Sequence, residues 1–153
     1  YKGRRYRLKV KRKKQKSYKF RFHQGTFLLN TPEHEHNDKV IRKVVKNWFT
    51  TQAQDHFSNR AIHFAKQLGV KPKEVKIVDN NMFWGENRKN IIFLNWRLIM
   101  APVKVQDYII VHELAHLIER KHSEKFWNIV STTLPDYKKR KEWLRDNQSE
   151  LYF

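Results

Sequence analysis

Hydrophobic residues and cations alternate along the first part of the chain. The runs RRYRLKVK and YKFRF each place an apolar residue at every second position, and Gly25 marks a turn before a third run, TFLLN. A period of two is typical of a β-strand with one buried and one solvated face. We therefore predict an antiparallel β-meander over residues 1–30 whose solvated face is basic.

The period changes after Asn37. Apolar residues then recur at intervals of three and four from Val40 to Leu68, which is the spacing of one face of an α-helix. Asn37 can cap the first turn, and Gly69 suits the left-handed conformation that ends many helices. The pattern predicts one long helix over residues 37–69.

Two apolar runs and three helical patterns follow. The runs VKIVD and NIIFLNW are predicted strands joined through NNMFWGENRK. Pro102 suits the start of a helix, Ser123 suits the cap of another, and Pro135 separates that one from a last, cationic helix. We predict one α+β domain over residues 1–153, in which a small mixed sheet packs on the long helix and on the helix after Pro102. Residues 75–147 supply the strands and helices of its second half.

The helix after Pro102 carries the segment IIVHELAHLIERKHSEKFW, residues 109–127. Side chains four apart lie on the same face of a helix, so His112 and His116 can direct two imidazoles at one metal ion. Glu113 projects about 100° away from His112 and can reach a water beside the ion without being a ligand. HExxH is expected by chance about 0.02 times in a chain of this composition, so we interpret it as a metal site with an adjacent general base.

A metal site of this type needs a third protein ligand. His122 lies six residues after His116, and an unbroken helix would rotate it by about 240° relative to His116. We therefore predict that the helix ends between residues 117 and 121, so that His122 folds back. Glu142 and Asp136 are alternative third ligands, and we favour His122 over both. The alternative to a metal site is that the polar residues of the motif only hydrogen-bond to neighbouring strands.

The composition limits the chemistry further. The chain has no cysteine, so a metal must be held by His, Asp or Glu. Lys and Arg number 33 against 15 Asp and Glu, a net charge of +18. Such an excess favours an anionic partner, and we expect DNA or RNA to bind through Arg5, Arg7, Lys9 and Lys11. No apolar run is long enough to cross a bilayer, and we expect a cytoplasmic monomer with no membrane partner.

Several short motifs surround HExxH. LNWRL occupies residues 94–98, Ala-Pro 101–102, HELAHL 112–117 and His-Ser 122–123, and the pairs or triplets Phe-Trp, Pro-Asp-Tyr and Trp-Leu follow. With these motifs, residues 75–145 resemble the YgjP-like metallopeptidase family, relatives of the SprT-like and minimal gluzincin proteases. The resemblance implies that His112, His116 and His122 bind zinc and that Glu113 is catalytic. The family usually has Arg-Trp-Gly-Ser-Cys where this chain has FWGEN at residues 83–87, which bears on substrate preference.

These features predict a zinc metallopeptidase, a hydrolase with one Zn²⁺ per chain. It would cleave protein or peptide substrates with a metal-activated water and Glu113 as general base. An extended substrate aligns best on an exposed strand edge. We expect that edge in NIIFLNW or in the adjoining MFWGEN run, with Trp84, Gly85 and Asn95 contributing. The alternative is a basic nucleic-acid-binding module with a structural or non-catalytic metal, as part of a DNA repair or restriction system. The presence of Glu113 favours the peptidase.

Overall fold

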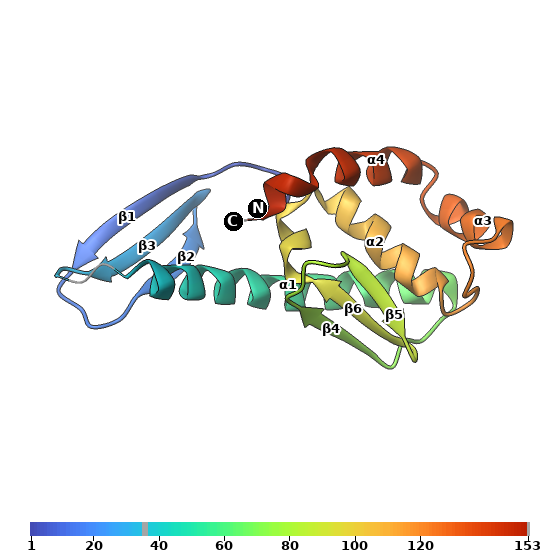
Figure 1. Ribbon diagram of the computed structural model, residues 1–153, viewed down its shortest axis with the longest axis horizontal. Coiled ribbons are helices and arrows are strands. Elements are labelled where there is room, and N and C mark those ends of the chain that lie inside the picture. The colour runs from blue at the N-terminus through green and yellow to red at the C-terminus, as the bar shows by residue number, and fades with distance from the viewer. Residues whose placement is uncertain (35–36, 153) are drawn as a thin grey trace.

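The computed structural model describes residues 1–34 and 37–152 and has two small sheets beside one long helix (Figure 1). The helices are α1 (Asp38–Leu68), α2 (Val103–Ala115), α3 (Glu124–Thr133) and α4 (Tyr137–Asn147), with short 3₁₀ helices η1 (Trp96–Met100) and η2 (Gln148–Leu151). The predicted α+β class is confirmed, and both sheets are mixed. None of the described helices combines the length and apolar character needed to cross a bilayer.

The first sheet contains β1 (Arg7–Lys13), β2 (Lys19–His23) and β3 (Thr26–Pro32) in the order β1-β3-β2. β2 and β3 form the predicted antiparallel pair, but β1 runs parallel to β3 and does not touch β2 in the ladder. The predicted meander is therefore wrong in its topology. β3 contains Phe27, Leu28 and Leu29 in succession, apolar on both faces, and such a strand belongs at the centre of a sheet. The cation-rich strands take the edges.

One face of this sheet packs against α1. The register places Phe20 and Phe22 of β2 beside Leu29 and Phe27 of β3, and the ring of Trp48 on α1 lies 5.4 Å from that of Phe27. The apolar residues of β1 share this face, but all of β1 is exposed, with Leu8 and Val10 at 53% and 57%. The alternation in β1 therefore gives a strand without burying its apolar side.

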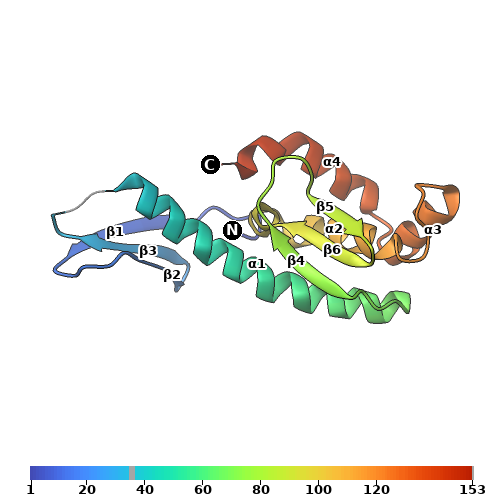
Figure 2. The same cartoon turned by 60° about the horizontal axis from the view of Figure 1, so that its bottom comes forward.

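The long helix α1 joins the first sheet to the rest of the molecule (Figure 2). Asn37 caps it by accepting a hydrogen bond from the Val40 amide at 3.2 Å, and Gly69 ends it in the left-handed conformation at φ 67°. At 1.5 Å per residue its 31 residues extend about 46 Å. Its second half packs against α2, and Arg60 donates two hydrogen bonds, of 2.7 and 2.8 Å, to the carboxylate of Asp107 on α2.

The second sheet contains β4 (Glu74–Val78), β5 (Gly85–Arg88) and β6 (Ile91–Asn95) in the order β4-β6-β5. The predicted strands VKIVD and NIIFLNW are present and parallel, and β5 forms inside the segment expected to be a connection. β6 is the central strand, so the expectation of a free edge on NIIFLNW is wrong. β5 is an edge strand, joined to β6 through Lys89 and Asn90, both with positive φ as in a tight hairpin turn.

Candidate metal centre and active site

The end of α2 sets the geometry of the candidate site. The regular helix ends at Ala115, two residues before the predicted range, and one tighter turn carries the helical path to Ile118, whose amide donates to the Ala115 carbonyl at 3.0 Å. His116 therefore keeps the orientation that pairs it with His112. The chain then reverses before α3, which Ser123 caps by accepting from the Phe126 amide at 3.3 Å. This reversal returns His122 to the other two histidines.

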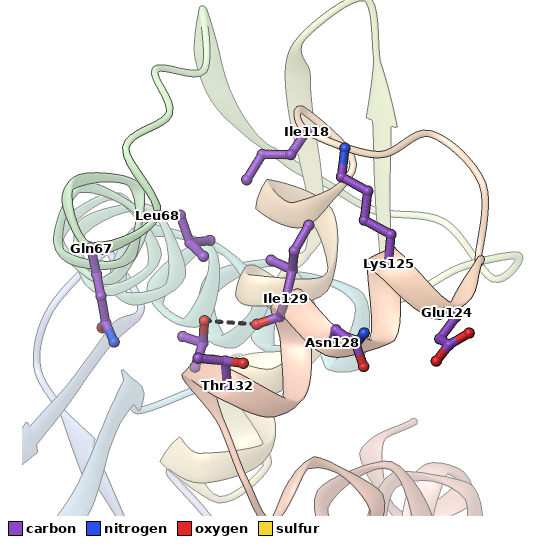
Figure 3. A pocket seen from close by; sticks show the side chains of 9 residues that line it. Gln67, Leu68, Ile118, Glu124, Lys125, Asn128, Ile129 and Thr132 are labelled. Carbon is purple, nitrogen blue, oxygen red and sulfur yellow. Dashed lines mark hydrogen bonds between the residues drawn. The ribbon is translucent and has the colours of Figure 1, made fainter.

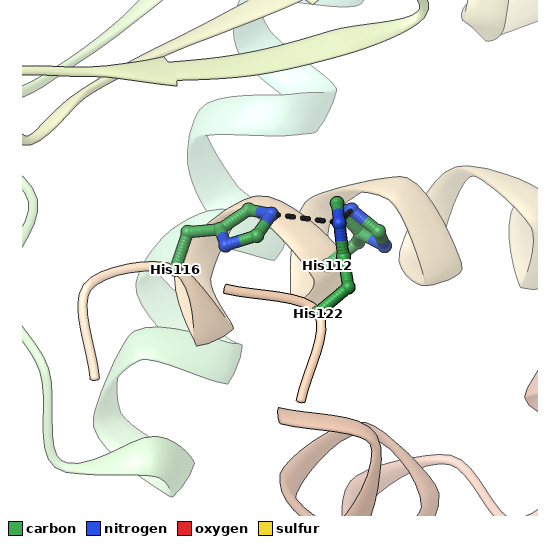
Figure 4. A group of neighbouring side chains, drawn as sticks. All are labelled: His112, His116 and His122. Carbon is green, nitrogen blue, oxygen red and sulfur yellow. Dashed lines mark hydrogen bonds between the residues drawn. The ribbon is translucent and has the colours of Figure 1, made fainter. Parts of the chain in front are cut away.

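The three imidazoles converge on one point (Figure 4). Nε2 of His122 lies 3.0 Å from Nε2 of His112 and 3.2 Å from Nε2 of His116. A tetrahedral Zn²⁺ with nitrogen ligands at about 2.0–2.1 Å requires nitrogen–nitrogen separations of about 3.3 Å. These two separations are within a few tenths of an ångström of this value, and all three donor atoms lie within 4.8 Å of one another, so the donor set fits a zinc ion.

Hydrogen bonding and packing hold the rings in place. Nδ1 of His116 lies 3.1 Å from the carbonyl oxygen of Glu119, and a carbonyl only accepts, so the proton of His116 is on Nδ1 and the Nε2 lone pair faces the cluster. Nδ1 of His112 is buried and has no hydrogen-bond partner among the described residues. The fully buried Phe126 lies behind all three rings, with centroid distances of 4.5–4.9 Å.

The electrostatic environment favours the neutral forms of His112 and His122. Burial first, and then the positive charges that His116, His122 and Lys141 can carry, lower the pKa of His112 to about 3. The pKa of the exposed His122 is also lowered, by desolvation, His116 and Lys141. Neutral imidazole is the form that binds a metal ion.

Glu113 sits between α2 and β5. Its side chain is 5% exposed, and burial followed by the negative charge of Glu86 raises its pKa to about 8. Its backbone carbonyl would normally accept from the amide of Leu117, but that amide bonds to Leu114 because the helix tightens there. Nδ2 of Asn87 donates to the freed carbonyl at 3.0 Å and fixes β5 to the helix.

Gly85 leaves the space that Glu113 occupies. A Cβ atom at Gly85 would lie 2.7 Å from Cγ2 of Ile109 and 2.9 Å from both Cγ and Oε1 of Glu113. Both distances are shorter than real Cβ atoms tolerate. The sequence analysis proposed Gly85 as part of a substrate-binding strand edge. The structure shows in addition that its missing side chain leaves room for Glu113.

A cleft of about 590 Å³ lies between β5 and the three histidines. Its walls are the strand β5, the hairpin residues Lys89 and Asn90, the metal-site residues His112, Glu113, His116 and His122, and Arg120. An edge strand, the buried carboxyl group of Glu113 and three histidines that could hold a metal ion thus face the same space. The arrangement can align an extended chain and deliver a water to its backbone.

Trp84 and Asn95, the other two residues expected in the substrate-binding edge, have different surroundings. Trp84 directly precedes β5, and its ring packs against Tyr152 with centroids 5.6 Å apart. Asn95 is fully buried, its amide donates to the carbonyls of Asn80 and Phe83, and its side-chain oxygen accepts from the Arg97 amide. Asn95 therefore secures a loop and is not available to a substrate.

The alternative third ligands point elsewhere. Asp136 accepts from Arg140 at 2.8 Å, and Glu142 lies 3.4 Å from Arg145; neither joins the cluster of potential metal ligands in the described part of the chain.

The predicted nucleic-acid contacts lie at the other end of the molecule. Arg7, Lys9 and Lys11 are on β1, whereas Arg5 precedes the strand and lies 3.5 Å from Glu150.

A separate hollow lies between the end of α1 and α3 (Figure 3). Its lining includes the apolar side chains of Leu68, Ile118 and Ile129 and offers one carboxylate, Glu124, and no histidine. It therefore lacks the groups for metal-assisted chemistry.

Sequence reasoning missed Asn87 and Phe126 as parts of the site. Asn87 lies in a segment without hydrophobic alternation, and nothing in its neighbours predicts a contact with Glu113. Phe126 offered one signal: it comes four residues after His122 near the start of a capped helix, where it can reach back toward that histidine.

Comparisons with known proteins agree with this geometry. The model of the family described as YgjP-like, metallopeptidase domain, matches residues 1–147. A search of curated proteins found no match. Among solved structures, the crystal structure of the metallopeptidase zymogen of Pyrococcus abyssi abylysin is similar, with a TM-score of 0.54 and 24% sequence identity; the match covers 60% of this chain and 95% of that one. At this identity the likeness supports the fold alone.

Proposed function

The chain belongs to the YgjP-like metallopeptidase family, and from this premise we propose that it is a zinc-dependent peptidase with one zinc ion held by His112, His116 and His122. The observation that carries the proposal is the convergence of three imidazoles beside the buried carboxyl group of Glu113, in a cleft walled by an edge strand. A zinc ion held there would polarise the substrate carbonyl and would lower the pKa of its bound water to about 7.

Glu113 supplies the proton transfers in this mechanism. In its ionised form, Glu113 accepts the proton of the attacking water as a general base and then delivers it to the nitrogen of the leaving amine as a general acid. Gly85 and Asn87 hold the residue for this task, Gly85 by leaving space for the side chain and Asn87 by tying its backbone to β5. The other acid in the cleft, Glu86, lies 2.6 Å from Arg88 and is partly neutralised by it.

The substrate is an extended segment of protein or peptide that pairs with the free edge of β5. Backbone pairing selects extended chain and discriminates little among side chains, so we expect unfolded or flexible protein to be cleaved. Folded domains keep most of their backbone hydrogen bonds occupied and cannot add a strand at this position.

A proteome digest tests the peptidase assignment. A denatured proteome is incubated with the wild type and with Glu113→Gln, and the fragments are identified by mass spectrometry. We expect new cleavage sites from the wild type only, because an amide cannot accept the proton. Zinc content, measured by elemental analysis, should stay near one per chain in Glu113→Gln. Identical fragments from both proteins would remove the assignment.

A second candidate function, nucleic-acid binding, is favoured by the composition and register of the first sheet. Residues 1–32 contain twelve Lys and Arg and no Asp or Glu. The strand register brings six of these cations to the face opposite α1, namely Arg7, Lys9, Lys11 and Lys13 of β1 and Lys19 and Arg21 of β2. We call these six residues the cationic face. The corresponding residues of β3 are uncharged, so like charges repel across this face unless an anion lies on it.

The cationic face suits the phosphates of duplex nucleic acid. It has no Phe, Tyr or Trp on which the bases of a single strand could stack. We therefore propose backbone contacts without sequence preference, at the end of the molecule away from the cleft (Figure 1).

A paired substitution tests the proposed face. The double variant Lys9→Gln, Lys11→Gln should bind a fluorescent duplex more weakly than the wild type. The control, Lys71→Gln with Lys73→Gln, removes the same charge from two exposed lysines that are also two residues apart. Equal loss of affinity in both double variants would show that only net charge matters, and it would refute the proposal that nucleic acid binds at the cationic face.

A further inference from the structure

A hollow of about 530 Å³, distinct from the one between α1 and α3, adjoins the proposed metal site on the side of α3 and α4. It is lined by Trp127, Tyr137, Lys138, Lys141, Glu142 and Arg145. The rings of Trp127 and Tyr137 stack at 5.3 Å and 19° and form an aromatic wall. Trp127 also stacks on His122, at 5.8 Å and 23°. Because His122 lines the catalytic cleft and Trp127 lines this hollow, the two spaces meet at that ring pair.

The hollow lies toward one end of the cleft. Tyr137 stacks on Tyr108, which is one helical turn before His112. The opposite end of the cleft is marked by Arg120, which follows His116, and by Lys89. β5 runs from one end to the other, because Gly85 lies against Ile109 and the chain then passes Glu113 toward Lys89.

The direction of the substrate follows from the direction of β5. Antiparallel pairing is the more stable arrangement per residue. A substrate strand antiparallel to β5 would have its N-terminal part near Lys89 and its C-terminal part near Gly85 and Tyr108. The residue that follows the cleaved bond is then the one beside the hollow.

The charges of the hollow are not balanced. Arg145 forms ion pairs with Asp146 at 2.8 Å and Glu142 at 3.4 Å. Neither Lys138 nor Lys141 has an ion-pair partner among the described residues. The ammonium group of Lys141 lies 5.2 Å from the centroid of Trp127, where a cation–π contact fixes it over the aromatic wall. An aromatic wall with a fixed, unpaired cation matches an acidic side chain, whose methylene groups pack on the ring while the carboxylate meets the ammonium.

We propose that this hollow binds the side chain of the substrate residue immediately after the cleaved bond, and that Lys141 selects Glu or Asp at that position. The inference rests on the proposed peptidase function and names a substrate class for it. Lys141 is here a specificity-determining residue and has no part in the proton transfers.

Cleavage-site profiling tests the selection. Peptides derived from a proteome are digested with the wild type, with Lys141→Glu and with Lys139→Glu, a charge-matched control on the same helix outside the hollow. We expect the wild type and the control to favour Glu and Asp after the cleaved bond by about 1.5-fold to fivefold, the range for an exposed ion pair. Lys141→Glu should lose this preference and gain one for Lys and Arg. Equal profiles from the three proteins, or a preference before the bond, would overturn the proposal.

A binding measurement separates this proposal from the peptidase assignment. Fluorescein-labelled decapeptides of Ser and Ala with one central Glu or Gln are titrated with Glu113→Gln protein, and anisotropy gives the ratio of the two dissociation constants. Lys141→Glu or Lys139→Glu is then introduced into the Glu113→Gln protein, and the two double variants, which have the same net charge, are compared. A Glu preference that falls only with Lys141→Glu supports the hollow even if no cleavage is found. An equal ratio in both proteins refutes it, even if cleavage is efficient.

Discussion

Replacing Gly85 by alanine tests the role of β5 in positioning Glu113. The added methyl group would lie 2.7 Å from Ile109 and 2.9 Å from two atoms of Glu113, whereas ordinary van der Waals contact begins near 3.4 Å. Either β5 moves outward by several tenths of an ångström or the Glu113 side chain rotates. Overpacking of this kind costs about 1–3 kcal/mol of stability. A displaced carboxylate should lower kcat/KM by about 10²-fold, because catalysis is sensitive to displacements below 1 Å.

The control is Gly25→Ala, in the first sheet. Gly25 has φ 70°, and a Cβ there would meet no atom within 4 Å, so the substitution costs about 1–2 kcal/mol through left-handed strain alone. Urea unfolding measures both stability losses, and a fluorogenic peptide measures kcat/KM. Gly25→Ala should lose stability and keep its activity, while Gly85→Ala should lose both and keep its zinc.

A double-mutant cycle identifies the colliding atoms. In Glu113→Ala protein, two of the three close contacts to the new methyl are gone, so Gly85→Ala should cost clearly less stability than in the wild type. Equal costs in the two backgrounds would mean that the strain comes from Ile109 alone. Full activity of Gly85→Ala would refute the positioning role.

Three further predictions concern the metal, pH and salt. His122→Ala should lose zinc by elemental analysis and Glu142→Ala should keep it, and the reverse result would replace His122 by Glu142 as third ligand. Asp79 accepts from Lys46, Trp96 and Arg97, which hold its pKa below the usual range, so its contribution to stability is present above about pH 4 and is lost as pH falls further. The stability difference between wild type and Asp79→Asn, measured by urea unfolding, should therefore shrink in acid. Duplex affinity should fall with salt with a log–log slope of about −5 if all six residues of the cationic face contact phosphate, and the Lys9, Lys11 double variant should lose about 2 from this slope; a flat dependence would refute binding.

Local sequence signals predicted the helical parts of the molecule. The caps Asn37 and Gly69 and the three-to-four period between them identify α1 because helix periodicity and capping involve neighbouring residues only. The spacing of His112, His116 and His122 predicted the cluster for the same reason. The regular part of α2 ends at Ala115, two residues earlier than predicted. The turn after Ala115 tightens, and this tighter turn carries the helical path to Ile118 before the chain reverses.

Long-range pairing was not predictable from the same signals. β1 and β2 have similar alternation, and nothing local shows that β3 lies between them. β5 has the sequence GENR, with no hydrophobic residue, and it becomes a strand because β6 pairs with it and α2 supports it. Asn95 appeared suited to a substrate edge because it ends an apolar strand, but its neighbours across the sheet bury it.

The three proposed ligands lie in the single segment 112–122, whereas the positioning of Glu113 depends on β5, some 25 residues earlier in the chain. A segment this short can gather its imidazoles before the two sheets assemble, so the unfolded chain should retain some affinity for zinc. Ligand binding stabilises a protein only through the difference between its native and unfolded affinities. Zinc should therefore raise the melting temperature by less than its native dissociation constant implies, and newly made chains should take up the metal before β5 positions Glu113.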